Sequence, residues 1–525
     1  MTMKWHALAV GVVFALGASL VAQSSDEDVA RRQLESGRAF MRQGNYTEAI
    51  KDFRAVADTH ASSSVADAAL LEIAKYYFEI AEDYPAASTA VDDILKKYAT
   101  SHSAPDAYVL AGRLALARSH QPADLDAAVA NFDRVIRLFP ASSAVPNALE
   151  RLGETNWYAG KLDDALSYLG RVEAEYSTTM AAADAYLAES RVLVARGDPT
   201  AAMEELQQVR NRWPASVEAS TALARTTVLF RLYVRTRGGG AAYALAPDTV
   251  GPAKIENVVD LAITPKGALY LATETGVTAL LPPDAPKPPA VGRPRALAVD
   301  TSGNLAVLEP GMLHPGASDP FSFPVLRSNG VTEALSKATA AGQLSNGDWV
   351  VADENEKYLH RYSRVGKYGN VFSTTRLSKF AVSSMDEVAG LDRDQKAVTI
   401  LDTAGKPIGR IPYKGTGYEL QNPEALAYDS FGHLYVLDHT AIVIFSPFPP
   451  AADPSAPKPA APAGTTAAAA PTTMTDHGAA FHLLTIYTEP EKSPGSFRKA
   501  TAFAIDRTGT VYLYDDRAQR ILVYR

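Results

Sequence analysis

Two different internal repeats, one in each half of the chain, constrain the fold more than any other feature of the sequence. In residues 28–235 apolar residues recur every three or four positions, which is the spacing of amphipathic helices. After the glycine run at 238–240 they recur every second position, which is the spacing of strands. With 525 residues the chain is also too long for one ordinary core. The pattern therefore predicts a helical domain followed by an all-β domain.

The helical repeat has a short motif: a polar turn, a small Ala, and a large apolar residue four positions later. "GNYTEAIKDF" (44–53), "GKLDDALSYL" (160–169) and "GDPTAAMEEL" (197–206) are clear copies. Ala allows two helices to approach closely, and the larger residue fills the space one turn further on. The stretch "ARSHQPADLD" (117–126) adds about one helical turn to the third unit. The five pairs are Ala49/Phe53, Ala87/Val91, Ala128/Phe132, Ala165/Leu169 and Ala202/Leu206.

Proline and serine mark the helix boundaries, as in "RLFPASSAVPNAL" (137–149) and "RWPASVEASTAL" (212–223). Together these features resemble the tetratricopeptide repeat, and the junctions are similar to those of bacterial envelope proteins that serve outer-membrane assembly and division. The resemblance implies an α-solenoid of about five helix pairs and a cap helix over residues 27–236. Such a solenoid has a concave groove that binds protein partners.

The β repeat is clearest in "PEALAYDSFGHLYVLD" (423–438), with near-copies at 294–309 and 500–515. Each copy is a strand, a tight turn with Asp and usually Gly, and a second strand. These units resemble NHL repeats, which are the blades of a β-propeller. The resemblance implies six blades over residues 256–525, with 237–255 as a hinge and ring-closing strand. The looser copies are 258–273, 338–353 and, most degraded, 388–402.

The composition of two segments predicts export of the chain and a disordered loop in the propeller. Residues 1–23 have a weakly basic start and a long uncharged apolar run, which predicts a signal peptide or, alternatively, an uncleaved membrane anchor. The absence of cysteine excludes disulfides, thiolate metal sites and a lipid on cysteine. A net charge of −8 argues against a nucleic-acid partner. The Pro/Ala/Thr-rich insert 447–480 is predicted to be a disordered loop of the propeller.

No catalytic, cofactor or metal motif stands out. Asp429 and Asp438 occupy repeat positions, which indicates capping of turns. His433 has no histidine at the equivalent place in other blades and shares strand parity with His439, so a metal pair is an alternative. Asp300 and Asp506 match Asp429, and Asp353, Asp402 and Asp515 match Asp438. The candidates for partner binding are Trp157, Tyr158, His433 and His439, although for the two aromatic residues packing inside the solenoid is the favoured interpretation.

These features together favour an exported, non-enzymatic scaffold of the bacterial periplasm or cell envelope, without cofactor. It would bind protein partners through the solenoid groove and one propeller face, and would reach a membrane only through an uncleaved N-terminal segment or a partner. The alternative is a small-ligand or glycan sensor, or a metal-dependent lyase or hydrolase, with its site in the propeller and the solenoid as a docking arm.

Overall fold

The computed structural model describes residues 26–81, 83–118, 121–247, 250–316, 318–326, 331–415, 418–448, 481–489 and 493–525. The predicted signal peptide and residues 449–480 of the predicted disordered insert lie outside the described residues. Two compact units make up the chain, residues 1–155 and 156–525. The boundary falls inside a helix and not at the change of repeat type, because the last helices pack on the propeller.

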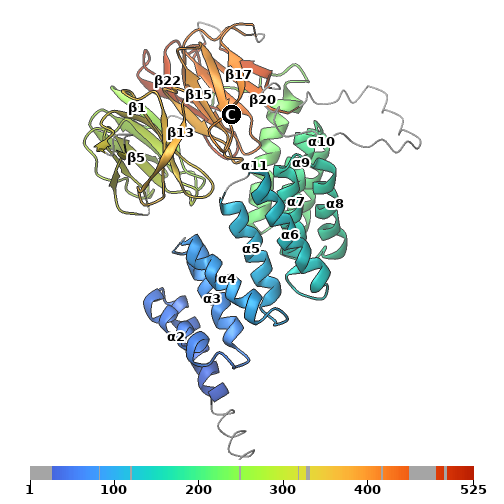
Figure 1. Ribbon diagram of the computed structural model, residues 1–525. Helices are drawn as coiled ribbons and strands as arrows, with labels where there is room; N and C mark the ends of the chain where they lie inside the picture. The colour runs from blue at the N-terminus through green and yellow to red at the C-terminus, as the bar shows by residue number, and fades with distance from the viewer. Residues whose placement is uncertain are drawn as a thin grey trace, which may run out of the picture. The chain divides into compact units, whose positions relative to one another are not determined.

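The first unit consists of helices in consecutive antiparallel pairs (Figure 1). The small and large residues of the repeat motif are buried as predicted: Ala49, Phe53, Ala128 and Phe132 are all fully inaccessible. The first helix of the third pair approaches the second so closely that only glycine fits at position 112, against the Phe132 ring. The helices are residues 26–42, α2 (Tyr46–Thr59), α3 (Ala66–Glu79), α4 (Tyr84–Lys97), α5 (Ala104–Arg118), α6 (Pro122–Leu138) and α7 (Val145–Tyr158), which crosses the boundary.

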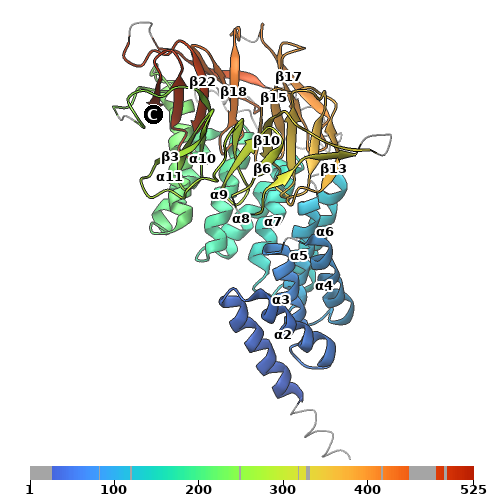
Figure 2. The same cartoon turned by 90° about the vertical axis from the view of Figure 1, so that its left-hand side faces the viewer.

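The second unit begins with the remaining helices, which lie beside one another next to the strands (Figure 2). Asp198 and Ser216 cap α10 and α11 by accepting hydrogen bonds from backbone N–H groups three residues on, at 2.9 and 3.0 Å. Within the described residues the helical part therefore has the predicted five pairs and a cap helix. Its later helices are α8 (Leu162–Glu175), α9 (Met180–Ala195), α10 (Pro199–Arg212), α11 (Val217–Leu229) and a π-helical extension of α11, η1 (Phe230–Arg235).

Six antiparallel sheets follow and form the predicted six-bladed propeller. The first strands of the blades neighbour one another in turn, and the last of them, β22, neighbours β1, so the ring is closed. The first three blades are β1 (Val258–Ile263), β2 (Leu269–Thr273) and β3 (Gly276–Leu281); then β4 (Ala296–Val299), β5 (Leu305–Glu309), β6 (Met312–His314) and β7 (Phe321–Ser322); then β10 (Ala338–Gln343), β11 (Trp349–Asp353), β12 (Leu359–Tyr362) and β13 (Tyr368–Ser373). The last three blades are β14 (Phe380–Val382), β15 (Val388–Asp392), β16 (Ala397–Leu401) and β17 (Pro407–Pro412); then β18 (Pro423–Tyr428), β19 (Leu434–Asp438), β20 (Ala441–Ser446) and β21 (His482–Tyr487); then β22 (Ala500–Ile505), β23 (Val511–Asp515) and β24 (Arg520–Tyr524). Between the second and third blades, β8 (Pro324–Leu326) and β9 (Thr332–Ala334) form a separate hairpin.

The segment after the helices lies along the outer strand of the last blade. Leu245 forms a bridge with Tyr524, and Val250 forms one with Ile521. The Ala246 N–H donates to the Val523 carbonyl at 2.8 Å. The segment nominated as the closing strand thus covers the open edge of β24 by isolated bridges and not as a regular strand.

The prediction for the fourth blade is wrong by one strand. Residues 388–402 form its second and third strands, and its first strand is the short β14. In the turn after β14, Asp386 adopts φ of 62° where the other blades have glycine, so the turn signature is absent from the sequence. The residue equivalent to Asp438 is consequently Asp392, at the end of β15, and not Asp402.

Candidate functional site

His433 joins the cap helix to the fifth blade in the interior of the second unit. Its ring is completely buried, with Nδ1 2.7 Å from the Asp429 carboxylate and Nε2 2.7 Å from the Tyr233 hydroxyl of η1. Because a carboxylate only accepts, Nδ1 donates to Asp429, while Nε2 and the Tyr233 hydroxyl share a second hydrogen bond. Burial raises the pKa of Tyr233, which keeps this hydroxyl protonated. His433 therefore holds two parts of the unit together and does not lie on a surface that a partner could reach.

A second contact joins η1 to the sixth blade. The buried Arg231 guanidinium donates to the Thr508 carbonyl at 2.9 Å and lies 4.9 Å from the Tyr243 ring centroid. The Tyr243 hydroxyl donates to the Gly509 carbonyl at 3.0 Å, and burial raises its pKa to about 12. A cation stacked on an aromatic face and bonded to a carbonyl tolerates burial better than an isolated one. These contacts account for the grouping of the last helices with the propeller.

Trp157 is buried, as the packing alternative predicted, whereas Tyr158 is half-buried beside it. The Arg191 guanidinium lies 4.7 Å from the Trp157 ring centroid. Trp157 also borders a small, mainly apolar cavity of about 110 Å³ against the turns of the fourth and fifth blades. One acidic group, Glu387, lines this cavity, and its burial raises the pKa of the carboxyl to about 7.

His439 lies on the other end of β19 from His433, so the two histidines do not form a metal pair. Five strand residues separate them, which is roughly 20 Å of extended chain. His439 Nε2 lies 3.2 Å from the Glu424 carboxylate, and about a third of its side chain is exposed. Of the four residues nominated for partner binding, Tyr158 and His439 are the two that remain accessible.

The repeated aspartates cap turns and hold strands, as their repetition indicated. Asp429 Oδ1 accepts from the backbone N–H groups of Phe431 and His433 at 2.9 and 3.0 Å. The Asp438 carboxylate accepts from the N–H groups of Gln421 and Asn422, which lead into the first strand of the same blade. Asp300 and Asp506 occupy the position of Asp429 in their blades, and Asp353 and Asp515 occupy that of Asp438.

The central channel is a cavity of about 310 Å³ lined by the first strand of every blade. Most of its walls are Ala, Leu, Val, Ile and Phe, but Asp260 and Lys379 bring one negative and one positive charge to it. Asp260 accepts from the N–H groups of Leu261 and Leu297, both at 2.9 Å, and so links the first two blades. Burial raises the pKa of the Asp260 carboxyl, and the nearby charge of Lys379 opposes that shift.

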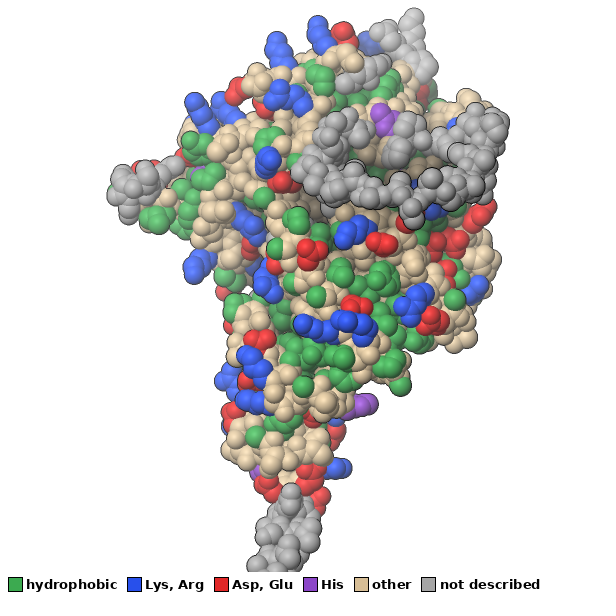
Figure 3. Space-filling view, turned by 45° about the vertical axis from the view of Figure 1, so that its right-hand side comes forward, with side chains coloured by type: hydrophobic (Ala, Val, Ile, Leu, Met, Phe, Trp, Pro, Cys, Tyr) green, Lys and Arg blue, Asp and Glu red, His purple; other side chains and the backbone are tan. Residues whose placement is uncertain are grey.

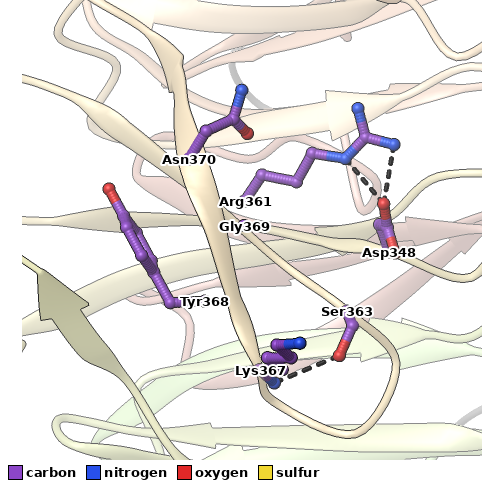
Figure 4. A pocket seen from close by; sticks show the side chains of 7 residues that line it. All are labelled: Asp348, Arg361, Ser363, Lys367, Tyr368, Gly369 and Asn370. Carbon is purple, nitrogen blue, oxygen red and sulfur yellow. Dashed lines mark hydrogen bonds and ion pairs between the residues drawn. The ribbon is translucent and has the colours of Figure 1, made fainter.

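A larger and more open groove of about 430 Å³ lies on the outer strands of the third blade (Figure 4). Arg361 points towards Asp348, with a nitrogen 2.6 Å from its carboxylate, whereas Tyr368 points away from this pair. The ion pair compensates the charges of Arg361 and Asp348, and Lys367 is the remaining charged residue that lines the groove. The groove consequently offers a ligand one positive charge beyond the ion pair.

Within the first unit, three tyrosines of the first two helix pairs form a partly exposed group, called here the tyrosine cluster. The Tyr46 ring centroid lies 5.7 Å from that of Tyr76, which lies 5.2 Å from that of Tyr77. The Arg54 guanidinium donates to the Tyr77 hydroxyl at 2.7 Å. Tyr46 is 37% exposed, and the other two are half-buried. Sequence reasoning missed this cluster because Tyr46 and Tyr76 are 30 residues apart and belong to different repeat units.

The described residues show neither a metal centre nor a membrane span. They contain no group of three or more His, Cys, Asp or Glu side chains that could hold a metal ion. No helix within the described ranges is both long and apolar enough to cross a bilayer. On the face drawn in Figure 3, acidic and basic side chains alternate with hydrophobic ones and neither sign of charge dominates.

The comparisons with known proteins agree with the helical repeat. Residues 27–161 match the YfiO family, described as outer membrane lipoprotein, and residues 150–217 match the tetratricopeptide repeat. The N-terminal part is thus built of tetratricopeptide-type repeats. No curated protein is significantly similar in sequence to the chain.

Several solved structures are similar in parts, at low identity. A streptogramin B lyase is 10% identical, covering 54% of this chain and 97% of its own, with a TM-score of 0.32. A Bacteroides thetaiotaomicron protein of unknown function is 11% identical over 54% of this chain and 72% of its own, with a TM-score of 0.36. The MamA protein is 16% identical over 35% of this chain and 92% of its own, with a TM-score of 0.28. At such scores, the fold assignment rests on the strand and helix pairing of the chain itself.

Proposed function

We propose that the protein is an exported, non-enzymatic scaffold of the bacterial cell envelope that binds a protein partner through its tetratricopeptide-type helices. The observation that carries this proposal is the tyrosine cluster, which lies inside the region that matches an outer membrane lipoprotein family. Tyrosine and arginine are the residues most enriched at the energetic centres of protein interfaces. The cluster supplies both, since Arg54 is bonded to Tyr77.

The tyrosine cluster suits a partner because its members are held in place before binding. Ring-to-ring contacts and the Arg54 hydrogen bond restrict their rotamers, so little side-chain entropy is lost when a partner covers them. The partner would present an apolar surface with acceptor groups for the hydroxyls. The propeller would act as a second platform through the strand ends that carry His439, which are the ends away from the docked helices.

The envelope location is supported by the matched family and by the apolar N-terminal run. The sequence has no cysteine, so a lipid on cysteine is not among the features shared with that family. Export by a cleaved signal peptide predicts a mature N-terminus near residue 23. Sequencing the N-terminus of the protein recovered from the periplasm tests this, and an uncleaved Met1 in the membrane fraction would favour the anchor instead.

Photo-crosslinking in living cells tests the partner. A benzoylphenylalanine replaces Tyr46 in one variant and Lys96, an exposed residue of α4, in a control. We expect one dominant protein adduct from position 46 and none from position 96, identified by mass spectrometry. The double variant Y76A/Y77A should abolish an adduct formed from position 46. Equal adducts from both positions, or none from position 46, would contradict the scaffold function.

A further inference from the structure

Register comparison of the six blades shows that two residues break an otherwise uniform layer of the central channel. The first strand of each blade pairs with its second strand, and one position always lies opposite the fourth residue of that second strand. At this position four blades have alanine. The six residues in blade order are Asp260, Ala296, Ala340, Lys379, Ala425 and Ala502. Lys379 directly precedes β14, and its carbonyl accepts from the N–H of Leu391, the fourth residue of β15.

The two exceptions carry opposite charges and belong to the first and fourth blades. In a closed ring of six blades, these two blades stand opposite each other. Asp260 and Lys379 therefore approach the channel axis from opposite sides at the same level. The attraction between them extends across the cavity and not along one strand.

Contacts within the protein do not use the full hydrogen-bonding capacity of either charged group. Asp260 accepts two backbone hydrogen bonds, which leaves acceptor positions on both carboxylate oxygens. Lys379 is half-buried as a residue, and its ammonium has no hydrogen bond or ion pair among the described residues. Its N–H donors are therefore available to an anionic group of a ligand.

The remaining walls of the channel are suited to an apolar group. Two positions further along the first strands all six blades have a small residue, either alanine or glycine. These small residues leave the space, and the methyl groups of the five alanines among them contribute apolar surface to it. The volume of about 310 Å³ is at the lower end of ligand pockets, which are about 300–1,000 Å³. The six small residues are Ala262, Ala298, Gly342, Ala381, Ala427 and Ala504.

We propose that the central channel binds a free α-amino acid with an apolar side chain. Its ammonium group would face Asp260, its carboxylate would face Lys379, and its side chain would extend into the apolar part of the channel. The ligand would enter at the starts of the first strands, because the docked helices contact the turns at the opposite ends, at His433 and Thr508. This inference goes beyond the scaffold function and does not depend on it.

Isothermal titration calorimetry of the full chain with L-leucine and L-phenylalanine tests the proposal. The matched controls are isopentylamine and 4-methylpentanoate, which keep the apolar group of leucine but only one of its two charges. Each lost charge-assisted hydrogen bond should raise Kd about ten- to a hundredfold. Binding of either control as tight as that of leucine would overturn the zwitterion assignment, as would the absence of saturable heat with both amino acids at millimolar concentrations.

Variants separate a binding role from a structural one. K379A introduces the residue that four blades already have, so it should fold, and we expect it to raise the Kd for leucine at least about tenfold. K337A removes an exposed positive charge near the start of the third blade and should leave Kd unchanged. K379E places two carboxylates in the channel and should make isopentylamine the preferred ligand over leucine. Unchanged leucine binding by K379A would refute the site.

Discussion

Replacing Gly112 with alanine should destabilise the third helix pair, although alanine is the better helix former. A Cβ atom at this position of α5 would lie 2.4 Å from Cε1 and 2.5 Å from Cζ of Phe132. The Phe132 side chain is fully buried on α6, so any shift of its ring takes place inside the core of the helix pair. Either the ring must leave its rotamer or the two helices must move apart.

The size of the effect follows from two opposing contributions. Overpacking a buried site costs about 1–3 kcal/mol, whereas alanine gains about 1 kcal/mol over glycine in a helix interior. Because three ring atoms lie within 2.8 Å of the added carbon, the upper part of the overpacking range applies. We expect a net loss of about 1–2 kcal/mol in the free energy of opening α5 and α6, which corresponds to roughly five- to thirtyfold faster amide exchange.

Hydrogen-exchange mass spectrometry on the full chain measures this locally. Gly170 in α8 provides the control, since a Cβ there would meet no atom within 4 Å. G170A should therefore slow exchange in α8, by the gain in helix propensity of about 1 kcal/mol. Adding F132L to G112A should restore part of the protection in α5 and α6. Slower or unchanged exchange in G112A would refute the close packing of this helix pair.

Three further substitutions test the second unit by thermal unfolding of the full chain. Y233F should cost about 1–3 kcal/mol because it leaves the buried His433 Nε2 without a hydrogen bond, whereas Y46F at an exposed ring should be neutral. Burial raises the pKa of Glu387 from 4.5 to about 7, so the folded chain binds this proton more tightly and stability falls as pH rises across that interval. E387Q should flatten this decline and be the more stable protein above pH 7, and an unchanged pH profile would contradict the burial. D386G restores the glycine of the other blades but should still destabilise the protein by about 1–2 kcal/mol. The Asp386 carboxylate accepts from the Ser345 N–H and hydroxyl at 2.7 and 2.6 Å, and glycine loses both hydrogen bonds. A rise in melting temperature would show that the backbone strain at position 386 outweighs these bonds.

The helical repeat and the number of blades could be predicted from sequence because both follow from the spacing of residues within each repeat unit. A small residue followed by a large one four positions later makes a helix crossing wherever it occurs, and all five predicted pairs are buried. Likewise, a strand, a glycine turn and a second strand define a blade whatever surrounds them. The one misplaced copy, at 388–402, lies where Asp386 replaces the glycine and the local signal is lost.

The candidate binding residues were harder to predict, because their roles depend on which parts of the chain meet. His433 differs from its equivalents in other blades, and the sequence indicated a special role for it. That role, a buried bond to Tyr233, requires a residue 200 positions earlier. Trp157 faces the turns of distant blades for the same reason.

The sequence by itself determined the periods, the number of repeat units and the residues that pack within each unit, since these follow from interactions a few residues apart. Closure of the ring determined which residues that are distant in the sequence come close together. It placed Asp260 and Lys379, 119 positions apart in the sequence, at one level of a channel that exists only when all six blades are present. It also turned one end of the propeller towards the cap helix, where burial of His433 and Arg231 fixed their contacts. Such long-range placement depends on how whole blades pack, and no local spacing in the sequence encodes it.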